Sequence, residues 1–164
     1  KRNKKNISDK ERYTEIPDIL CELGRFGQKS GKGYYKYLND KNIAIEDDEL
    51  LKLIEEHRKN KKIDIKTFSE KEFLKRYIAA IVNQASNLLL NKVALRPSDI
   101  DIVSIYGYGF PKIYGGPMTY ADNYGLSNIL EDIKSFYKED PYFWKPSSFL
   151  IDLVKMKKCF QDLN

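Results

Sequence analysis

Apolar residues recur at three- and four-residue intervals along much of the chain, a pattern typical of amphipathic helices. A first helix is expected from Ile16 to Leu23, with Gly24 placed to end it. A second is expected over about residues 46–59, where acidic residues come first and basic ones last, as the helix dipole favours. Clear period-two alternation is absent, so the sequence predicts an all-α architecture with little or no sheet.

The strongest helical pattern begins after Ser69. Ser69 and Glu72 match the capping box, in which each side chain accepts a hydrogen bond from an exposed backbone N–H of the first turn. The apolar stripe that follows consists of Leu74, Ile78, Ile81, Ala85, Leu88 and Leu89, widened by Phe73, Tyr77 and Val82. A stripe of this width predicts a helix that is buried on more than one side.

A segment rich in glycine and proline, residues 107–126, separates two helical regions. Its first eleven residues hold four glycines and two prolines, which predicts a helix end, a tight turn and a new helix. Helices are expected around it at residues 97–106, 118–124 and 126–137, and a last one near residues 149–156. The expected roles are Gly107 and Gly109 at the helix end, Phe110 as an apolar plug beside Pro111, Gly115 and Gly116 at a close approach, and Pro117 at the next helix start.

The composition is that of a folded, mildly basic protein. Hydrophobic residues make up 41% and aromatics 13% of the 164 residues, so a packed core is expected beyond a polar segment at residues 1–12. The 29 Lys and Arg exceed the 24 Asp and Glu, for a net charge of +5. This excess fits either an anionic partner such as CoA or an ordinary lysine-coated surface, which we favour. Aromatic residues do not interleave with the basic N-terminal cluster, so nucleic-acid binding is not predicted.

The sequence holds few residues that could bind a metal ion or act as a nucleophile. Cys21, Cys159 and His57 are the only residues of their types, and their scatter does not give a zinc site, which needs about four suitably spaced ligands. His57 is expected at the surface near a helix end. Asp99 and Asp101 diverge on a helix, so capping roles are expected for them, and likewise for Asp122.

Residues 27–33 are rich in glycine but do not form a phosphate-binding loop. The Walker motif consists of a glycine, four further residues and then Gly-Lys-Ser/Thr. In this chain Lys32 is followed by Gly33. The dinucleotide fingerprint also fails, because no glycine stands at its third position. We therefore expect Gly31 and Gly33 to shape a structural turn that brings the following tyrosines into packing contacts.

The chain carries no recognisable targeting signal. It holds no apolar run of about 18 residues, it opens on Lys-Arg-Asn-Lys-Lys, and it ends on Gln-Asp-Leu-Asn rather than on a Ser-Lys-Leu peroxisomal address. These features predict a soluble, cytoplasmic protein without a membrane span. The absence of an initial methionine is typical of a piece of a longer polypeptide.

Two long motifs carry a family resemblance. The first covers residues 20–37, and the second runs from Val82-Asn83-Gln84-Ala85 through residues 94–101 to residues 107–118. Together they resemble the C-terminal domain of 3-hydroxyacyl-CoA dehydrogenases in multifunctional fatty-acid β-oxidation enzymes, over about residues 12–160. The resemblance implies the helical repeat of that domain, which has the 6-phosphogluconate dehydrogenase C-terminal-like fold. It assigns residues 1–37 to the tail of the first repeat, 38–68 to a linker with a short helix, and 69–164 to the second repeat.

The resemblance also implies a function. Such enzymes oxidise (3S)-3-hydroxyacyl-CoA to 3-ketoacyl-CoA and pass the hydride to NAD, which a Rossmann domain binds N-terminal to the repeats. The catalytic His-Glu pair of the family lies in that part as well, so this fragment is expected to be inactive alone, with no catalytic, cofactor-binding or metal residue. Its expected partners are the first repeat and the NAD domain, with acyl-CoA as substrate of the complete enzyme. A free-standing helical interaction module and a homo-oligomer remain alternatives.

Alignment of the two repeats of the family singles out Lys75. It places Lys75-Arg76 where the functional copy has Asn-Arg, and lysine cannot accept the hydrogen bonds that asparagine can. The second repeat is thus expected to be non-catalytic and to pack against the first, as the subunits of the shorter family enzymes do. Lys29 and Lys32 leave two interpretations open, a contact with CoA phosphates or an exposed turn. The residues expected in structural or interface roles are Gly31, Gly33, Asn83, Gly107, Gly109, Phe110, Pro111, Gly115, Gly116, Pro117 and Asp122.

Overall fold

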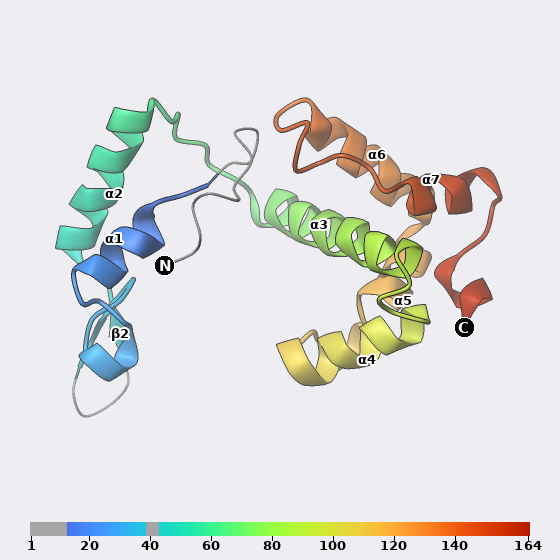
Figure 1. Cartoon of the computed structure of the whole chain (residues 1–164), viewed down its shortest axis with the longest axis horizontal. Helices are drawn as coiled ribbons and strands as arrows, with labels where there is room; N and C mark the ends of the chain where they lie inside the picture. Colours follow the sequence, from blue (N-terminus) through green and yellow to red (C-terminus); the bar gives the residue numbers. More distant parts are fainter. Residues whose placement is uncertain (1–12, 39–42) are drawn as a thin grey trace. The chain divides into compact units, whose positions relative to one another are not determined.

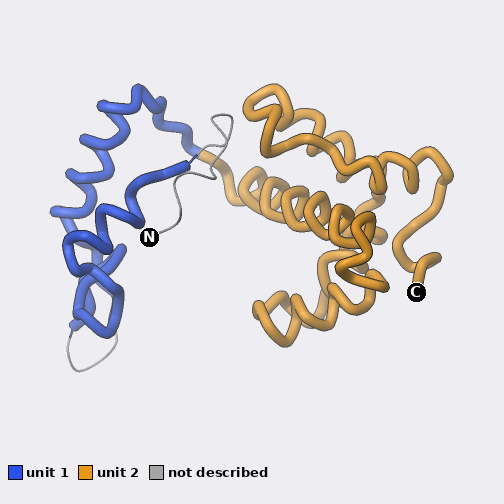
Figure 2. The backbone as a smooth tube through the Cα atoms, in the orientation of Figure 1, with its two compact units in different colours: residues 1–67 blue, residues 68–164 orange. Residues whose placement is uncertain are grey.

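The computed structural model describes residues 13–38 and 43–164, which form two compact units, residues 1–67 and 68–164 (Figure 2). Helices dominate both units, and the sheet of the described residues has only two short strands (Figure 1). The predicted all-α class is confirmed. The polar segment expected at residues 1–12 lies outside the described residues.

The first unit surrounds a small core. Its elements are α1 (Ile16–Glu22), η2 (Gln28–Ser30), β1 (Lys36–Tyr37), β2 (Ala44–Ile45) and α2 (Asp48–Lys61). The two strands pair antiparallel, so Ala44 and Ile45, which lie in the segment that the resemblance assigned to a linker, form strand β2 of a small sheet. The core that the described residues build here consists of Ile16, Leu20 and Leu50, with Leu53 and Ile54 partly buried beside them.

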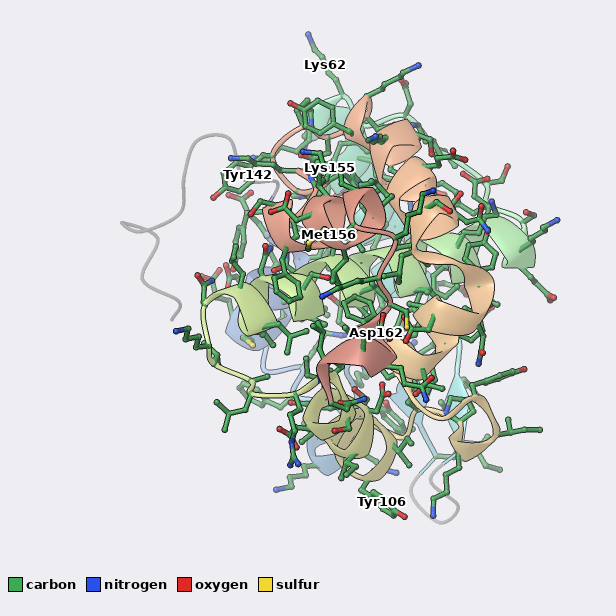
Figure 3. The ribbon with its side chains drawn as sticks, turned by 90° about the vertical axis from the view of Figure 1, so that its right-hand side faces the viewer. Lys62, Tyr106, Tyr142, Lys155, Met156 and Asp162 are labelled. Carbon is green, nitrogen blue, oxygen red and sulfur yellow. The ribbon has the colours of Figure 1, made fainter. Side chains whose placement is uncertain are left out.

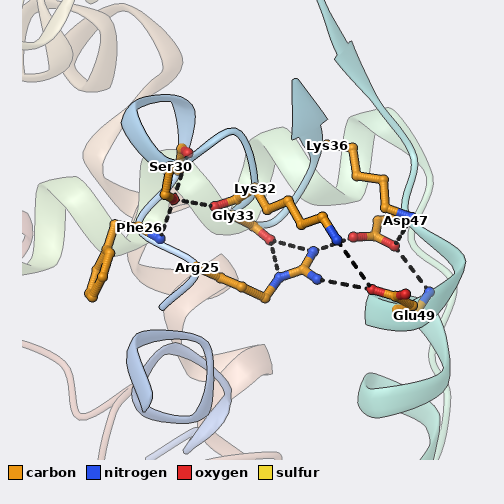
Figure 4. A network of polar contacts seen from close by, with 9 residues as sticks. Arg25, Phe26, Ser30, Lys32, Gly33, Lys36, Asp47 and Glu49 are labelled. Carbon is orange, nitrogen blue, oxygen red and sulfur yellow. Dashed lines mark hydrogen bonds and ion pairs between the residues drawn. The ribbon is translucent and has the colours of Figure 1, made fainter. Parts of the chain in front are cut away.

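The glycine-rich turn between α1 and β1 is held by close backbone contacts. The Ser30 hydroxyl accepts a hydrogen bond from the Phe26 amide at 2.8 Å and lies 2.9 Å from the carbonyl oxygen of Lys32 (Figure 4). A Cβ atom on Gly33 would lie 2.6 Å from the Cα of Gly27, which is too close for any real side chain. Gly31 has a φ of +71°, a conformation that glycine adopts without strain. The backbone geometry of this turn therefore accounts for its glycines.

A buried ion pair joins this turn to α2. The Arg25 guanidinium donates to the carbonyl oxygen of Gly33 at 3.0 Å and pairs with the carboxylate of Asp47, which Lys36 also reaches at 2.9 Å. Asp47 is 2% exposed and caps α2 by accepting a hydrogen bond from the Glu49 amide at 3.1 Å. The Arg25 hydrogen bond is the largest cause that holds the pKa of Asp47 well below its usual value of 3.8.

The first prediction concerns this carboxylate. Because the pKa of Asp47 is lowered by folding, its contribution to the unfolding free energy is complete above pH 3.8 and is lost as the pH falls below that value. We expect Asp47→Asn to lower the stability of the first unit at neutral pH and to remove part of its acid sensitivity. Thermal unfolding followed on backbone amide NMR signals of residues 13–38 at several pH values measures both effects.

Glu55→Gln is the matched control, because Glu55 is an exposed carboxylate on α2, the helix that Asp47 caps. The control should behave as the unmodified chain does. An Asp47→Asn chain with unchanged melting and an unchanged acid response would contradict the assigned role of the ion pair.

The second unit is built around one long helix. Its elements are α3 (Glu70–Leu90), α4 (Pro97–Tyr108), η3 (Lys112–Tyr114), α5 (Pro117–Tyr124), α6 (Leu126–Tyr137), α7 (Ser148–Lys155) and η4 (Phe160–Leu163). Helix α3 packs against α5, α6 and α7, while α4 packs mainly against α5 (Figure 1). The most deeply buried core side chains are Val82, Met118, Ile129, Ile133, Leu150, Leu153 and Phe160.

Helix α3 is capped and buried differently from the expectation. Ser69 accepts a hydrogen bond from the Glu72 amide at 3.2 Å, but the Glu72 carboxylate bonds to Arg76 at 3.0 Å. Val82 is fully buried, whereas Phe73 and Tyr77 are 63% and 47% exposed. The prediction that these aromatics widen the buried stripe is wrong, because no helix in the described part of the second unit buries them.

Candidate interface on the second helical unit

An apolar groove runs between α3 and α4 and has a volume of about 710 Å³. Three polar side chains, Gln84, Asp99 and Ser104, also border it. The side chains that give it its apolar character include Tyr77, Ile81, Leu88, Leu95, Val103 and Phe110. Such a large apolar depression on one unit is typical of a surface that another protein segment covers.

Helix α4 carries apolar residues on several sides, and few of its residues are buried. Only Pro97 and Asp101 are buried within it. Val103 is 56% and Tyr108 is 83% exposed, and Tyr106, which points outward from the molecule in Figure 3, is 75% exposed. Helices that are hydrophobic all round are normally enclosed by other elements. Helix α4 and the groove beside it are therefore the candidate interface of this chain.

The buried carboxylate of Asp101 fixes α4 on α5. It accepts hydrogen bonds from the Met118 amide at 2.7 Å, the Thr119 amide at 3.1 Å and the Thr119 hydroxyl at 2.8 Å. These amides belong to the first turn of α5, where backbone N–H groups lack partners within the helix. Asp101 thus caps a neighbouring helix rather than its own, a role that its sequence position does not reveal.

Gly116 makes this contact possible. Its φ is +103°, and a Cβ atom on it would lie 2.4 Å from the Asp101 side chain. The expected close approach at Gly116 is thus directed at Asp101. Gly115 has a φ of +73°, and a Cβ atom there would meet Thr119 at 2.7 Å. Pro117 then occupies the first position of α5, where its missing N–H needs no partner.

The preceding residues end α4 and fill the core. Gly109 ends α4 with a φ of +73°. Gly107 lies inside the last turn of α4, so the expectation that it helps to end the helix is wrong, since the helical pattern continues to Tyr108. Phe110 is buried in the core, and Pro111 stands directly before η3.

Asp122 holds the C-terminal segment. Its carboxylate accepts hydrogen bonds from the amides of Phe160 and Gln161 at 2.8 and 2.9 Å, so it caps η4 from α5. The side chain of Asn164 in turn accepts a hydrogen bond from the Ser98 amide at 2.9 Å in the first turn of α4. Elements α4, α5 and η4 are thereby joined in a closed cycle of side-chain caps.

Asn83 holds the segment before α7. Its amide nitrogen donates to the carbonyl oxygen of Lys145 at 2.9 Å, and its amide oxygen accepts from the Ser147 amide at 2.8 Å. Asn83 is 1% exposed, and these two bonds satisfy backbone groups on both sides of Pro146. The Asn83 side chain thus holds the backbone before α7 and is shielded from solvent.

Lys75 lies outside the groove and is paired. Its ammonium group is 2.9 Å from a carboxylate oxygen of Asp132, and the Tyr124 hydroxyl donates to the other oxygen at 3.2 Å. The hydrogen bond to Asp132 raises the pKa of Lys75 above its usual value. A protonated lysine held in this way donates hydrogen bonds and accepts none.

The histidine, the cysteines and the two turn lysines that the sequence analysis considered for chemistry or CoA binding do not form a common site among the described residues. His57 is half-buried on α2, Lys29 lies exposed in η2, and Lys32 is 3.8 Å from Glu49. Cys21 and Cys159 are free thiols. Over residues 13–38 and 43–164, no group of three potential metal ligands occurs, and none of the helices found there is long and apolar enough to cross a membrane.

Sequence comparison gives long matches to multifunctional enzymes, although no protein-family model matches the chain. The human peroxisomal bifunctional enzyme is 42% identical over 148 residues, which are 87% of this chain and 20% of that protein. The chain has homologues among the multifunctional β-oxidation enzymes. The peroxisomal fatty acid beta-oxidation multifunctional protein MFP2 of Arabidopsis thaliana is 34% identical over 151 residues, covering 90% of this chain and 21% of that relative. The chain spans about a fifth of the length of these curated relatives.

A solved structure of this family shares the fold. The dehydrogenase part of multifunctional enzyme 1 from C. elegans matches with a TM-score of 0.62 and 24% sequence identity, over 87% of this chain and 33% of that one. At this identity the match shows that the two chains share a fold.

The second prediction concerns the approach of Gly116 to Asp101. We expect Gly116→Ala to lower the free energy of unfolding of the second unit by about 1–3 kcal/mol, because the new methyl group combines a strained φ with a clash. Urea denaturation followed by the fluorescence of Trp144, which is 7% exposed in this core, measures the effect.

Gly109→Ala provides the control for φ alone. Gly109 has a positive φ of +73°, but a Cβ atom there would meet nothing within 4 Å. It should destabilise the unit less than Gly116→Ala does. Equal losses for the two variants would show that the approach to Asp101 contributes nothing beyond backbone strain.

Proposed function

We propose that this chain is the C-terminal helical part of an NAD-dependent 3-hydroxyacyl-CoA dehydrogenase within a multifunctional β-oxidation enzyme, where it acts as scaffold and interface. The complete enzyme would oxidise (3S)-3-hydroxyacyl-CoA to 3-ketoacyl-CoA. NAD and the catalytic His-Glu pair would belong to other parts of the polypeptide. The observation that carries the proposal is the exposed apolar surface of α3 and α4, on a chain that spans a fifth of its relatives.

The first repeat of the same enzyme is the proposed occupant of the groove. The relatives are about five times as long as the matched segment, so most of their chain is available to cover it. Covering the apolar groove removes hydrocarbon from water at about 25 cal/mol per Å² of buried area. Lys75, paired with Asp132, would leave this repeat without the polar group that the functional repeat supplies.

The first unit fits the proposed end of the first repeat. In this proposal residues 1–37 are the tail of that repeat, residues 38–68 the linker, and residues 69–164 the second repeat. Support comes from the three-residue core of the described part of this unit and from the exposure of Leu23 and Phe26, at 60% and 67%. So small a core rarely stabilises a fold without further structure packed on it.

The names of the relatives bear on location. The animal and plant relatives are described as peroxisomal or glyoxysomal, and the predicted cytoplasmic location has no direct support from them. We therefore propose the peroxisome as the location of the whole enzyme.

The third prediction is a reconstitution. We expect this chain alone to show no oxidation of NADH by acetoacetyl-CoA, and a mixture with the separately produced N-terminal portion to show more activity than that portion alone. Spectrophotometry of NADH measures the rate. Activity of this chain by itself would contradict the proposal that the catalytic residues lie in other parts of the polypeptide. Binding without any gain in rate would favour an interaction module over a scaffold.

A charged residue in the groove sharpens this test. Val103→Asp should weaken association with the N-terminal portion by more than about ten-fold, because a carboxylate buried in an apolar contact loses its hydration. Met156→Asp is the matched control, since Met156 is also 56% exposed but lies at the end of α7, outside the groove (Figure 3). Equal effects of the two variants in a titration would argue against the groove as the contact.

A further inference from the structure

A second, smaller hollow lies between α3, α5 and α6 and shares no lining residue with the apolar groove. Its volume is about 260 Å³. Leu74, Ile78 and Ile129 form an apolar surface inside it, and Tyr120 and Tyr124 form one wall. The two tyrosine rings stack with their centres 6.3 Å apart, which gives this wall a fixed shape.

Two lysines stand at this hollow, one helical turn apart. Lys71 and Lys75 are four residues apart on α3, so they lie on the same side of the helix, where like charges repel. Asp132 neutralises one of them through its 2.9 Å contact with Lys75. Lys71 has no ion pair or hydrogen bond with any residue in the described part of the chain. The hollow therefore carries one net positive charge next to an apolar surface.

We propose that this hollow binds a small amphipathic monoanion, an aliphatic carboxylate whose head contacts Lys71 and Lys75 and whose apolar body rests on Leu74, Ile78 and Ile129. The carboxylate would neutralise the one unbalanced charge and accept hydrogen bonds from the two ammonium groups. The hydrocarbon would displace water from an apolar surface that stays partly open, since Leu74 is 52% exposed.

The size and charge of the hollow select this ligand class. Sites for drug-sized molecules occupy about 300–1,000 Å³, so a hollow of 260 Å³ suits a smaller compound. A multiply charged phosphate would meet the carboxylate of Asp132 beside Lys75, whereas a monoanion matches the single excess charge. The inference is independent of the proposed dehydrogenase role, because it depends only on residues at this hollow.

The test is a titration of the full chain with octanoate below its micelle concentration, followed on the methyl NMR signals of isoleucine and leucine. We expect saturable shifts at Leu74, Ile78 and Ile129, together with weaker binding at high salt. Octanol and octylammonium are the probes for head-group charge, and both should bind more weakly than octanoate. Equal binding of octanol would overturn the proposed contact with the lysines.

Variants locate the site. Lys71→Gln should weaken octanoate binding by about two- to five-fold, which is the range expected for an exposed ion pair. Lys155→Gln removes an exposed lysine on α7 and should leave binding unchanged. Circular dichroism verifies that both variants keep the fold. Shifts centred on Ile81 and Leu88 in the larger groove, or equal binding by both lysine variants, would overturn the proposal.

Discussion

The close approach of Gly116 to the Asp101 carboxylate is the contact on which the arrangement of the second unit depends. It requires a glycine with a φ of +103°, because any Cβ atom would overlap with the carboxylate that caps α5. In the same way, Asp122 caps η4, and the Asn164 side chain caps the first turn of α4. Three elements thus satisfy each other's exposed N–H groups, which lets a short helix such as α4 hold its position with little burial of its own.

The consequence is a helix fixed in place with its apolar side chains turned to solvent. Ile102 and Val103 are each 56% exposed, and Tyr108 is 83% exposed. An isolated domain would lose little by replacing such residues with polar ones, whereas a domain that is covered by a neighbouring repeat gains from keeping them. The capping cycle fixes this surface, and the surface would carry the proposed association of the repeats.

Much of this arrangement was predictable from local sequence signals. The helix starts at Ser69 and Pro97 and the turn at Gly109 follow from capping and backbone rules, and the structure has them. The partners of Asp101 and Asp122 were not predictable, because they lie 17 and 38 residues away along the chain. The exposure of Phe73 and Tyr77 was also missed, since periodicity marks apolar side chains but not whether this chain or another segment covers them. The apolar residues at several positions around α4 were a signal for an interface in the residues themselves.

Amide hydrogen exchange of α4 tests the central claim most directly. The rates would be measured in this chain alone and in the complete enzyme, with α7 as the internal reference. If the first repeat covers the groove, exchange in α4 and in the part of α3 that lines the groove should slow in the complete enzyme, because opening these helices would then also break the interface. Equal exchange of α4 in both forms would contradict the account.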